Sequence, residues 1–281
     1  MKVYEELVTS TSEYFLNSPS QEGRELFFYP VCLGRYEYKP LYNLSRNSYD
    51  SYLLMQITKG KCTITAKGQN FQAQRGQLVF LDCYKPHGYS TETGWSANWI
   101  HFDGPMAGKY FEYITNNEKF IFTPSLDNKF TREFEKLFTG FKTGNIADEA
   151  SMSLSITSML TELIINTPQS APTERNRELI SDITYYINTH FKEDITLEQL
   201  ADMAHLSPFY FTKLFKAKTG YTPHEYVITT RLNHAKYLLS NTNLTIKEIC
   251  FACGFASESR FCTSFKKFVG VTPSVYKGAG T

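Results

Sequence analysis

The spacing of hydrophobic and polar residues changes along the chain, and each change predicts a different kind of element. Between residues 25 and 105, short apolar runs alternate with glycine-containing turns, a pattern typical of β-strands in a sandwich or barrel. The expected strands are 52–58, 62–66, 71–73 and 78–81, with turns at Gly60, Gly68 and Gly76. Further along, apolar residues recur three or four positions apart, which predicts amphipathic helices over 130–141 and 152–163.

The last part of the chain repeats itself. At a constant offset of 50 residues, the identical pairs are Ser207/Ser257, Phe211/Phe261, Phe215/Phe265, Lys216/Lys266, Gly220/Gly270, Thr222/Thr272, Pro223/Pro273 and Tyr226/Tyr276. Upstream the offset is 49, which pairs Thr196 with Thr245. Such self-similarity indicates one supersecondary unit used twice.

Each repeat has the signals of a short helix, a tight turn and a longer helix. The short helices open with capping boxes, Thr196–Gln199 and Thr245–Glu248, in which each side chain satisfies a backbone N–H of the other residue. Ser207 and Ser257 are the expected caps of the longer helices, which end at glycines. This arrangement predicts two helix-turn-helix units.

A third capping box, Thr222–Glu225, opens a helix that connects the two units and runs to about Leu239. Some 18 residues at ~1.5 Å each give a rod of about 27 Å. That length approaches the ~34 Å between successive major-groove faces of DNA, so both longer helices could reach one side of a duplex.

The outward faces of the longer helices are the candidate DNA-contacting surface. With the paired phenylalanines turned inward, the candidate residues are Ser207, Phe209, Thr212, Lys213, Lys216, Ser257, Glu258, Ser259, Arg260, Thr263 and Lys266. Arg260 could pair with guanine, Glu258 accept from cytosine and Phe209 touch a thymine methyl, whereas Lys213 and Lys216 could hold phosphates. The alternative is a solvated face of an ordinary helical bundle.

The run from Ile246 to Lys277 closely resembles the signature of AraC-type transcriptional regulators, and with the upstream unit the resemblance covers about 175–278. It implies two bridged helix-turn-helix units that read adjacent major grooves in a regulator that is not an enzyme. Cys250 and Lys277 depart from the pattern, which commonly has alanine and arginine there. RNA polymerase is considered as a further partner.

The runs Gly76–Tyr89 and Trp99–Gly104 resemble the cupin-like effector domain of sugar-responsive AraC regulators. The resemblance implies that Trp99 and Tyr89 face a pocket with Arg46 near its mouth. The candidate effector-binding residues are Arg46, Gln56, His87, Tyr89, Trp99 and His101. An aromatic face can stack on a pyranose while Arg, His and Gln bond its hydroxyls, so a sugar is the expected effector.

Three questions about this half stay open at the level of sequence. Alternation along 95–103 does not show which face lines the pocket, and Trp99 could instead be plain core. Arg46 could be a surface arginine, and His87 a hydrogen-bonded structural histidine. The helices over 130–141 and 152–163 could cover the barrel, and the family resemblance adds self-association as a homodimer.

The alternative function is a metal-dependent cupin enzyme with a helical accessory domain. A metal site would need clustered histidines with a carboxylate, whereas His87 and His101 are isolated. No metal, cofactor or enzymatic activity is therefore expected. Cys250 and Cys253 are expected to be two buried thiols rather than half of a metal site.

Composition and charge add little. The chain has 281 residues, with net charge −2 over 1–172 and +3 over 173–281, a weak asymmetry in the direction expected for a DNA-binding C-terminal half. No apolar run reaches ~18 residues and no signal peptide is evident, so a cytoplasmic protein without a membrane span is expected. Pro168 and Pro172 predict a linker over 166–175.

The predicted fold class is therefore α+β with more than one domain. A cupin-like β-barrel with following helices is expected over 1–165 as the effector-binding and dimerisation domain. An all-α DNA-binding domain with two helix-turn-helix units is expected over 176–281.

Overall fold

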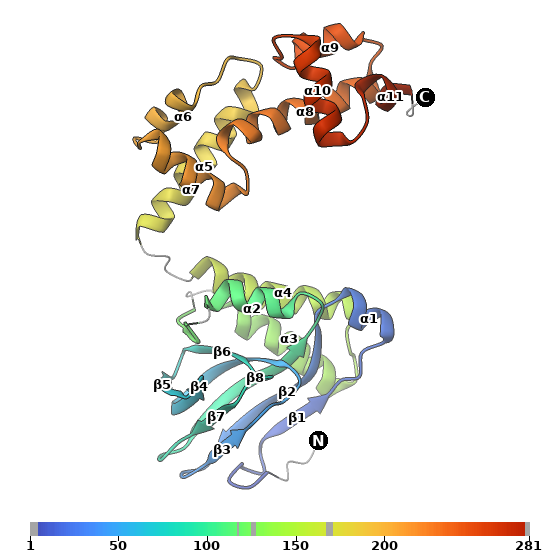
Figure 1. The fold of residues 1–281 in the computed structure, drawn as a ribbon. Helices are drawn as coiled ribbons and strands as arrows, with labels where there is room; N and C mark the ends of the chain where they lie inside the picture. The colour runs from blue at the N-terminus through green and yellow to red at the C-terminus, as the bar shows by residue number, and fades with distance from the viewer. Residues whose placement is uncertain (1–4, 117, 125–127, 167–170, 279–281) are drawn as a thin grey trace. The chain divides into compact units, whose positions relative to one another are not determined.

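The chain forms two compact units, Met1–Thr167 and Pro168–Thr281, in a computed structural model (Figure 1). The structure describes residues 5–116, 118–124, 128–166 and 171–278. The N-terminal unit is rich in β-structure and the C-terminal unit is helical, as the hydrophobic spacing predicts.

The N-terminal unit is built on antiparallel strands that form two sheets. The strands are β1 (Glu13–Leu16), β2 (Tyr29–Tyr38), β3 (Asn43–Arg46), β4 (Tyr52–Ala66), β5 (Gln69–Gln74), β6 (Leu78–Asp82), β7 (His87–Ser90), β8 (Trp95–Asp103) and β9 (Ile121–Phe122). One sheet has the order β1-β2-β8-β4-β6-β9, and the other joins β3, β7, β4 and β5.

Strand β4 belongs to both sheets. Its first half pairs with β6 and β8, and its second half pairs with β5 and β7. The predicted turn at Gly60 is therefore wrong: the register shifts between Ile57 and Lys59, and Gly60 takes a φ of +71° while the strand continues. A bulge of this kind lets a strand bend from one sheet into the next, which closes the sheets around a cavity.

Among the residues that the structure describes, four helices complete this unit: α1 (Gln21–Leu26), α2 (Ala107–Thr115), α3 (Lys129–Thr143) and α4 (Glu149–Asn166). Figure 1 shows α2, α3 and α4 lying together over one side of the sheets. The two predicted amphipathic helices correspond to α3 and α4, and their apolar stripes are buried in one core with Phe80 and Phe102. Each fully buried Phe contributes roughly 1.5–3 kcal/mol relative to exposure, so these helices hold the sheet from its outer face.

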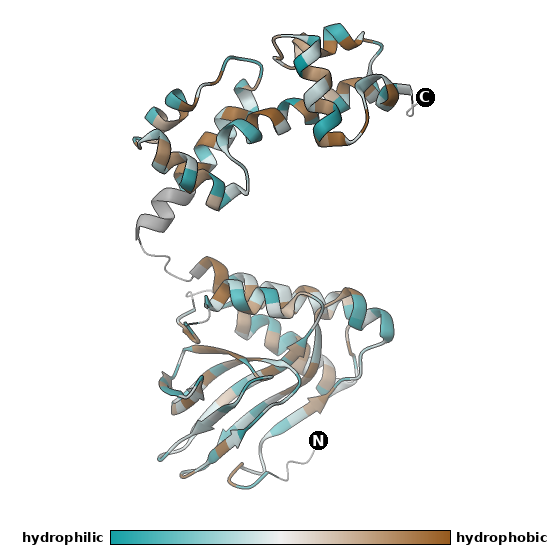
Figure 2. Cartoon of the chain, viewed as in Figure 1, coloured by the Kyte–Doolittle hydropathy of each residue, from teal (hydrophilic) through white to brown (hydrophobic). Residues whose placement is uncertain are grey.

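The C-terminal unit is a chain of helices. They are α5 (Ala171–His190), α6 (Leu197–Met203), α7 (Pro208–Thr219), α8 (Pro223–Asn241), α9 (Ile246–Ala252), α10 (Glu258–Val269) and α11 (Pro273–Gly278). Figure 2 shows hydrophobic and hydrophilic positions alternating along them.

The helix caps form as the sequence predicts. In all three capping boxes the threonine hydroxyl accepts from the backbone N–H three residues on, and the Gln or Glu side chain accepts from the threonine N–H. Ser207 and Ser257 cap α7 and α10, which end at Gly220 and Gly270 with φ of +80° and +91°. Both predicted helix-turn-helix units, α6–α7 and α9–α10, are thus confirmed.

Each helix-turn-helix unit has its own core, and α8 contributes to both. Phe211 and Phe215 are fully buried in the first core, where α8 supplies Val227. The second core holds the equivalent phenylalanines with Leu232 and Leu239 from the later part of α8. It also contains Cys250 and Cys253, both fully buried, so the prediction of two buried thiols is confirmed.

The region between the units differs from the predicted linker over 166–175. Asn166 is the last residue of α4, and α5 already begins at Ala171, while residues 167–170 lie outside the described residues. Pro172 is compatible with this helix because it lies in the first turn, where a backbone N–H has no helical partner to lose.

Candidate DNA-binding face and effector cavity

The N-terminal half of α7 presents an exposed aromatic side chain. Phe209 is 84% exposed although it belongs to the residue class that cores bury, whereas Phe211 two positions on is fully buried. Lys213 and Lys216 are exposed further along the same helix. An exposed phenylalanine followed by two lysines can offer both an apolar contact and phosphate neutralisation.

Thr212 differs from this exposed set. Its side chain is half-buried, and its hydroxyl donates to the Pro208 carbonyl at 2.8 Å. Thr212 also lines a small cavity beside the start of α8. Of the predicted first-unit residues, it is therefore the least available to a partner.

The second unit presents a polar version of the same face. Its exposed candidates on α10 are Glu258, Ser259, Arg260, Thr263 and Lys266. The hydroxyls of Ser207 and Ser257 accept from the N–H groups of Tyr210 and Arg260, both at 3.4 Å, as helix caps. Because accepting leaves the hydroxyl proton available, each serine can still donate to a phosphate oxygen.

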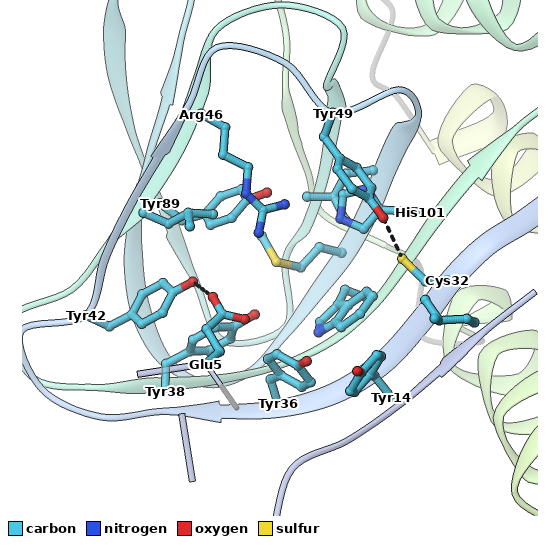
Figure 3. A pocket seen from close by; sticks show the side chains of 15 residues that line it. Glu5, Tyr14, Cys32, Tyr36, Tyr38, Tyr42, Arg46, Tyr49, Tyr89 and His101 are labelled. Atoms are coloured by element: carbon cyan, nitrogen blue, oxygen red, sulfur yellow. Dashed lines mark hydrogen bonds between the residues drawn. The ribbon is translucent and has the colours of Figure 1, made fainter. Parts of the chain in front are cut away.

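The N-terminal unit encloses a cavity of about 190 Å³ between its sheets (Figure 3). Of the predicted effector residues, Arg46, Tyr89, Trp99 and His101 line it. The odd-numbered face of β8 is thus the one turned to the cavity, a choice that sequence alternation leaves open. The even-numbered residues Ile100 and Phe102 are fully buried on the opposite face.

Gln56 is not a cavity residue, contrary to the prediction. Residues alternate along β4, so Leu53 and Met55 line the cavity while Gln56 points to the other side of the sheet. There its amide oxygen accepts from the Thr131 hydroxyl of α3 at 3.0 Å. Gln56 therefore links the sheet to a covering helix.

His87 is buried but also does not line the cavity. Its Nδ1 lies 2.8 Å from the Lys85 carbonyl, which fits the structural alternative for this residue. Its Nε2 has no hydrogen-bond partner among the described residues. Burial lowers the pKa of His87, and the nearby positive charge of Arg46 acts in the same direction.

Two hydrogen-bond donors of the cavity, Trp99 and Arg46, have no acceptor among the described residues. Trp99 is 8% exposed, and its buried Nε1–H has no hydrogen-bond partner among the described residues. The Arg46 side chain lies over the Tyr49 ring, with 5.3 Å from Cζ to the ring centroid, and makes no ion pair with any described carboxylate. A buried donor without an acceptor costs about 1–3 kcal/mol, so the Trp99 Nε1–H would gain from a ligand oxygen. Arg46 is half-buried, and its guanidinium can donate to the same ligand.

His101 is a neutral, anchored side chain. Its Nδ1 lies 2.8 Å from the Ser51 hydroxyl in the interior. Burial lowers the pKa of His101 to about 3, with smaller contributions from the neighbouring Arg46 and His87. At neutral pH the imidazole therefore acts as an uncharged hydrogen-bonding group.

Sequence reasoning missed much of the cavity wall, which is dominated by tyrosines. The further polar lining residues are Glu5, Tyr14, Tyr36, Tyr38, Tyr42 and Tyr49. The Tyr42 hydroxyl donates to Glu5, and Figure 3 shows Tyr36, Tyr38 and Tyr42 along one wall. The signal available in the sequence was the count of 19 tyrosines, with Tyr36 and Tyr38 at alternate positions of β2.

The described residues contain neither a candidate metal site nor a candidate membrane-spanning helix. Within residues 5–116, 118–124, 128–166 and 171–278, no three His, Cys, Asp or Glu side chains are grouped so that they could hold a metal ion. None of the described helices combines the length and apolar character needed to cross a bilayer.

Comparisons with known proteins agree with this two-part architecture. The AraC-like ligand binding domain family matches residues 29–164, and a helix-turn-helix domain family matches residues 200–279. The MmsAB operon regulatory protein of Pseudomonas aeruginosa is 25% identical over 259 residues, which cover 89% of this chain and 82% of that protein. The Msm operon regulatory protein of Streptococcus mutans is 24% identical over 245 residues, covering 84% and 87%.

A third relative is similar over a shorter stretch. The bifunctional transcriptional activator/DNA repair enzyme AdaA of Bacillus subtilis is 40% identical over 100 residues, which cover 36% of this chain and 47% of that protein. The fold and the matched domains together define a DNA-binding transcription regulator with an N-terminal ligand-binding domain. The chain belongs to the AraC family of transcriptional regulators.

Proposed function

We propose that α7 and α10 enter two neighbouring major grooves of double-stranded DNA and read sequence there. The observation that carries this proposal is the repeated design of the two helices. Both helices begin after a serine that caps them and end at a glycine in the left-handed conformation. Both also carry an exposed N-terminal half, in which Phe209 of the first helix is 84% exposed. A phenylalanine exposed at this position can contact a thymine methyl.

The connection between the two helices suits this role. Helix α8 has 19 residues and so spans about 28 Å, close to the ~34 Å between successive major-groove faces. Arg260 would pair with guanine and Glu258 accept from cytosine, while Lys213, Lys216 and Lys266 hold phosphates. Base contacts of this kind discriminate by about 1–3 kcal/mol each.

Footprinting on a duplex selected from random-sequence DNA tests this proposal. We expect protection over two adjacent major grooves on one side of the duplex. Arg260→Ala should relax the preference at one base pair, whereas Lys266→Ala should weaken binding to all sequences and reduce the salt dependence by about one counterion. If Arg260→Ala weakens all sequences equally, Arg260 does not read a base.

We further propose that the cavity binds a small polar effector, with a sugar as the best fit. The cavity combines an indole, several tyrosine rings, a neutral histidine and an arginine without an ion-pair partner among the described residues. Aromatic rings stack on the C–H face of a pyranose, and the polar groups match its hydroxyls. The effector would alter DNA binding by favouring one state of the protein over another.

A thermal-shift screen against mono- and disaccharides tests the effector proposal. A ligand that binds only the folded protein raises the melting temperature. Trp99→Ala should abolish the shift and the effect of the ligand on transcription while leaving DNA affinity unchanged. An unchanged shift in that variant would remove Trp99 from the binding site.

The remaining parts of the proposal concern partners and location. We propose that the protein acts in the cytoplasm as a homodimer, with α3 and α4 as the self-association surface and RNA polymerase as a further partner on DNA. Leu154 and Ile165 of α4 are large apolar side chains that are 67% and 63% exposed, which supports this surface. Sedimentation of Leu154→Glu beside the unchanged protein tests it, because a charge there should yield monomers.

A further inference from the structure

A short segment joins α5 to α6 and contacts both α8 and the turn of the second helix-turn-helix unit. We call residues 191–194 the brace. The Phe191 ring stacks on His234 of α8, with 4.0 Å between ring centroids and 17° between ring planes. Lys192 and Asp194 line a cleft of about 1020 Å³ together with Arg231 of α8 and the turn at Gly254. The brace therefore precedes the first unit in sequence but packs against α8 and the turn of the second unit.

Arg231 binds the brace through two backbone carbonyls. Its Nε donates to the Phe191 carbonyl and its Nη2 to the Glu193 carbonyl, both at 2.7 Å. The guanidinium also lies 5.8 Å from the ring centroid of Phe255 in the second unit. A planar guanidinium can reach two acceptors at once, which a lysine ammonium on a flexible stem does poorly.

Gly254 allows the second unit to approach the brace. A Cβ at residue 254 would lie 2.6 Å from the Lys192 carbonyl oxygen and 2.8 Å from its Cα. In the first repeat the equivalent residue is His205, which adopts φ of +52°, against +77° for Gly254. Since a histidine takes the left-handed conformation there, the turn alone does not require glycine. The close backbone of Lys192 does.

The two cores do not otherwise share a buried side chain among the described residues. Beyond the brace, α8 carries the connection, and its Thr230 hydroxyl donates to Asn188 of α5 at 3.3 Å. A single helix of about 28 Å can bend and twist, which would change the direction of α10 relative to α7.

We propose that Arg231 is a positioning residue for DNA recognition: it locks the brace against α8 and so fixes the separation and direction of the two recognition helices. The consequence for recognition rests on the proposed two-groove function, whereas the locking itself does not. Because the relative position of α7 and α10 is fixed before DNA binds, the protein recognises only sites with one spacing between the two contacted grooves. Loss of the lock should broaden the accepted spacing.

The first experiment measures the lock without DNA. Spin labels on a genetically encoded keto amino acid at Lys218 of α7 and Lys267 of α10 report the distance between the helices in the full chain. We expect one narrow distribution for the unchanged protein and a clearly broader one for Arg231→Met, Arg231→Lys and Gly254→Ala. His205→Ala is the matched control, because it alters the equivalent turn away from the brace. Distributions as narrow in Arg231→Met as in the unchanged protein would overturn the proposal.

The second experiment measures spacing on DNA. One base pair inserted between the two contacted grooves of the selected duplex moves the second groove by about 3.4 Å and rotates it by roughly 34°. The unchanged protein should lose about 100-fold in affinity because both units can no longer bind together. Arg231→Lys and Arg231→Met should bind the selected duplex more weakly and lose less than about fivefold on insertion.

The two experiments separate the possible failures. If Arg231 instead contacts a phosphate, Arg231→Lys would keep its affinity and the salt dependence would fall only in Arg231→Met. If the unchanged protein tolerates the insertion, two-groove reading fails, while the label distances still decide whether Arg231 locks the brace. Circular dichroism of each variant measures whether it is folded. If Gly254→Ala does not fold, Arg231→Lys still tests the proposal.

Discussion

Gly34 of β2 lies directly against the indole of Trp99: a Cβ at residue 34 would stand 2.4 Å from Cζ2 and 2.7 Å from Cε2 of that ring. The two residues are partners in the pairing of β2 with β8. The tryptophan therefore lies flat across its neighbouring strand because that strand has no side chain there. The Trp99 and Tyr36 rings pack edge to face, with 5.0 Å between their centroids and 86° between their planes.

Gly34→Ala should consequently impair the effector site more than the fold. The added methyl cannot fit without moving the indole, so we expect loss of the ligand-induced thermal shift. Overpacking of this kind costs about 1–3 kcal/mol of stability, which a urea titration measures. Gly278→Ala is a control, since nothing lies within 4 Å of its added Cβ. A full thermal shift in Gly34→Ala would show that the indole position does not matter to the ligand.

Arg46 should contribute directly to effector affinity. Arg46→Met removes a charged donor that has no described ion-pair partner, so we expect a loss of about 10–100-fold in affinity, measured by calorimetry. Arg75→Met, at an exposed position outside the cavity, should change affinity by less than twofold. Equal effects of the two substitutions would place Arg46 outside the binding site.

His101 should make stability depend on pH. Its folded-state pKa of about 3 lies below the ordinary value of 6.5, so the unfolded chain binds the proton first as pH falls. Its contribution is complete above pH 6.5 and decreases by about 1.4 kcal/mol per unit toward pH 3. At pH 5 this amounts to about 2 kcal/mol. Urea titrations at pH 7 and 5 should show this loss in the unchanged protein and a smaller one in His101→Asn, and equal losses would contradict the assignment.

Two neighbouring phenylalanines of α7 should behave in opposite ways. Phe211→Ala should cost about 3–5 kcal/mol of stability because the ring is fully buried. Phe209→Ala should change stability by less than about 0.5 kcal/mol because the ring is 84% exposed. In a binding titration with the selected duplex, however, Phe209→Ala should lose affinity. Retained affinity and base preference would make Phe209 an ordinary surface residue.

Local signals in the sequence determined the helical half of the molecule. A cap such as Thr245–Glu248 and a stop such as Gly270 act over a few residues, so the pattern that encodes them lies in one short segment. The repeat then identified equivalent positions in both units, including the buried phenylalanines. Helix α3 could be predicted for the same reason, since its apolar stripe is contained in one periodic run.

Only the tertiary structure decided how the β-unit forms its cavity. Both faces of β8 are apolar, because one packs on helices and the other on aromatic residues, so alternation could not show that Trp99 faces inward. The prediction that Gln56 lines the cavity is wrong for a similar reason, since alternation does not show which face of β4 turns to α3. The bulge near Gly60 depends on pairing with strands that are distant in sequence. Arg231 likewise depends on carbonyls about 40 residues away. Contacts within one turn of a helix are determined by residues close together in sequence. Which face of a strand lines the cavity, and which group a side chain contacts, depend on segments that meet only when the chain folds.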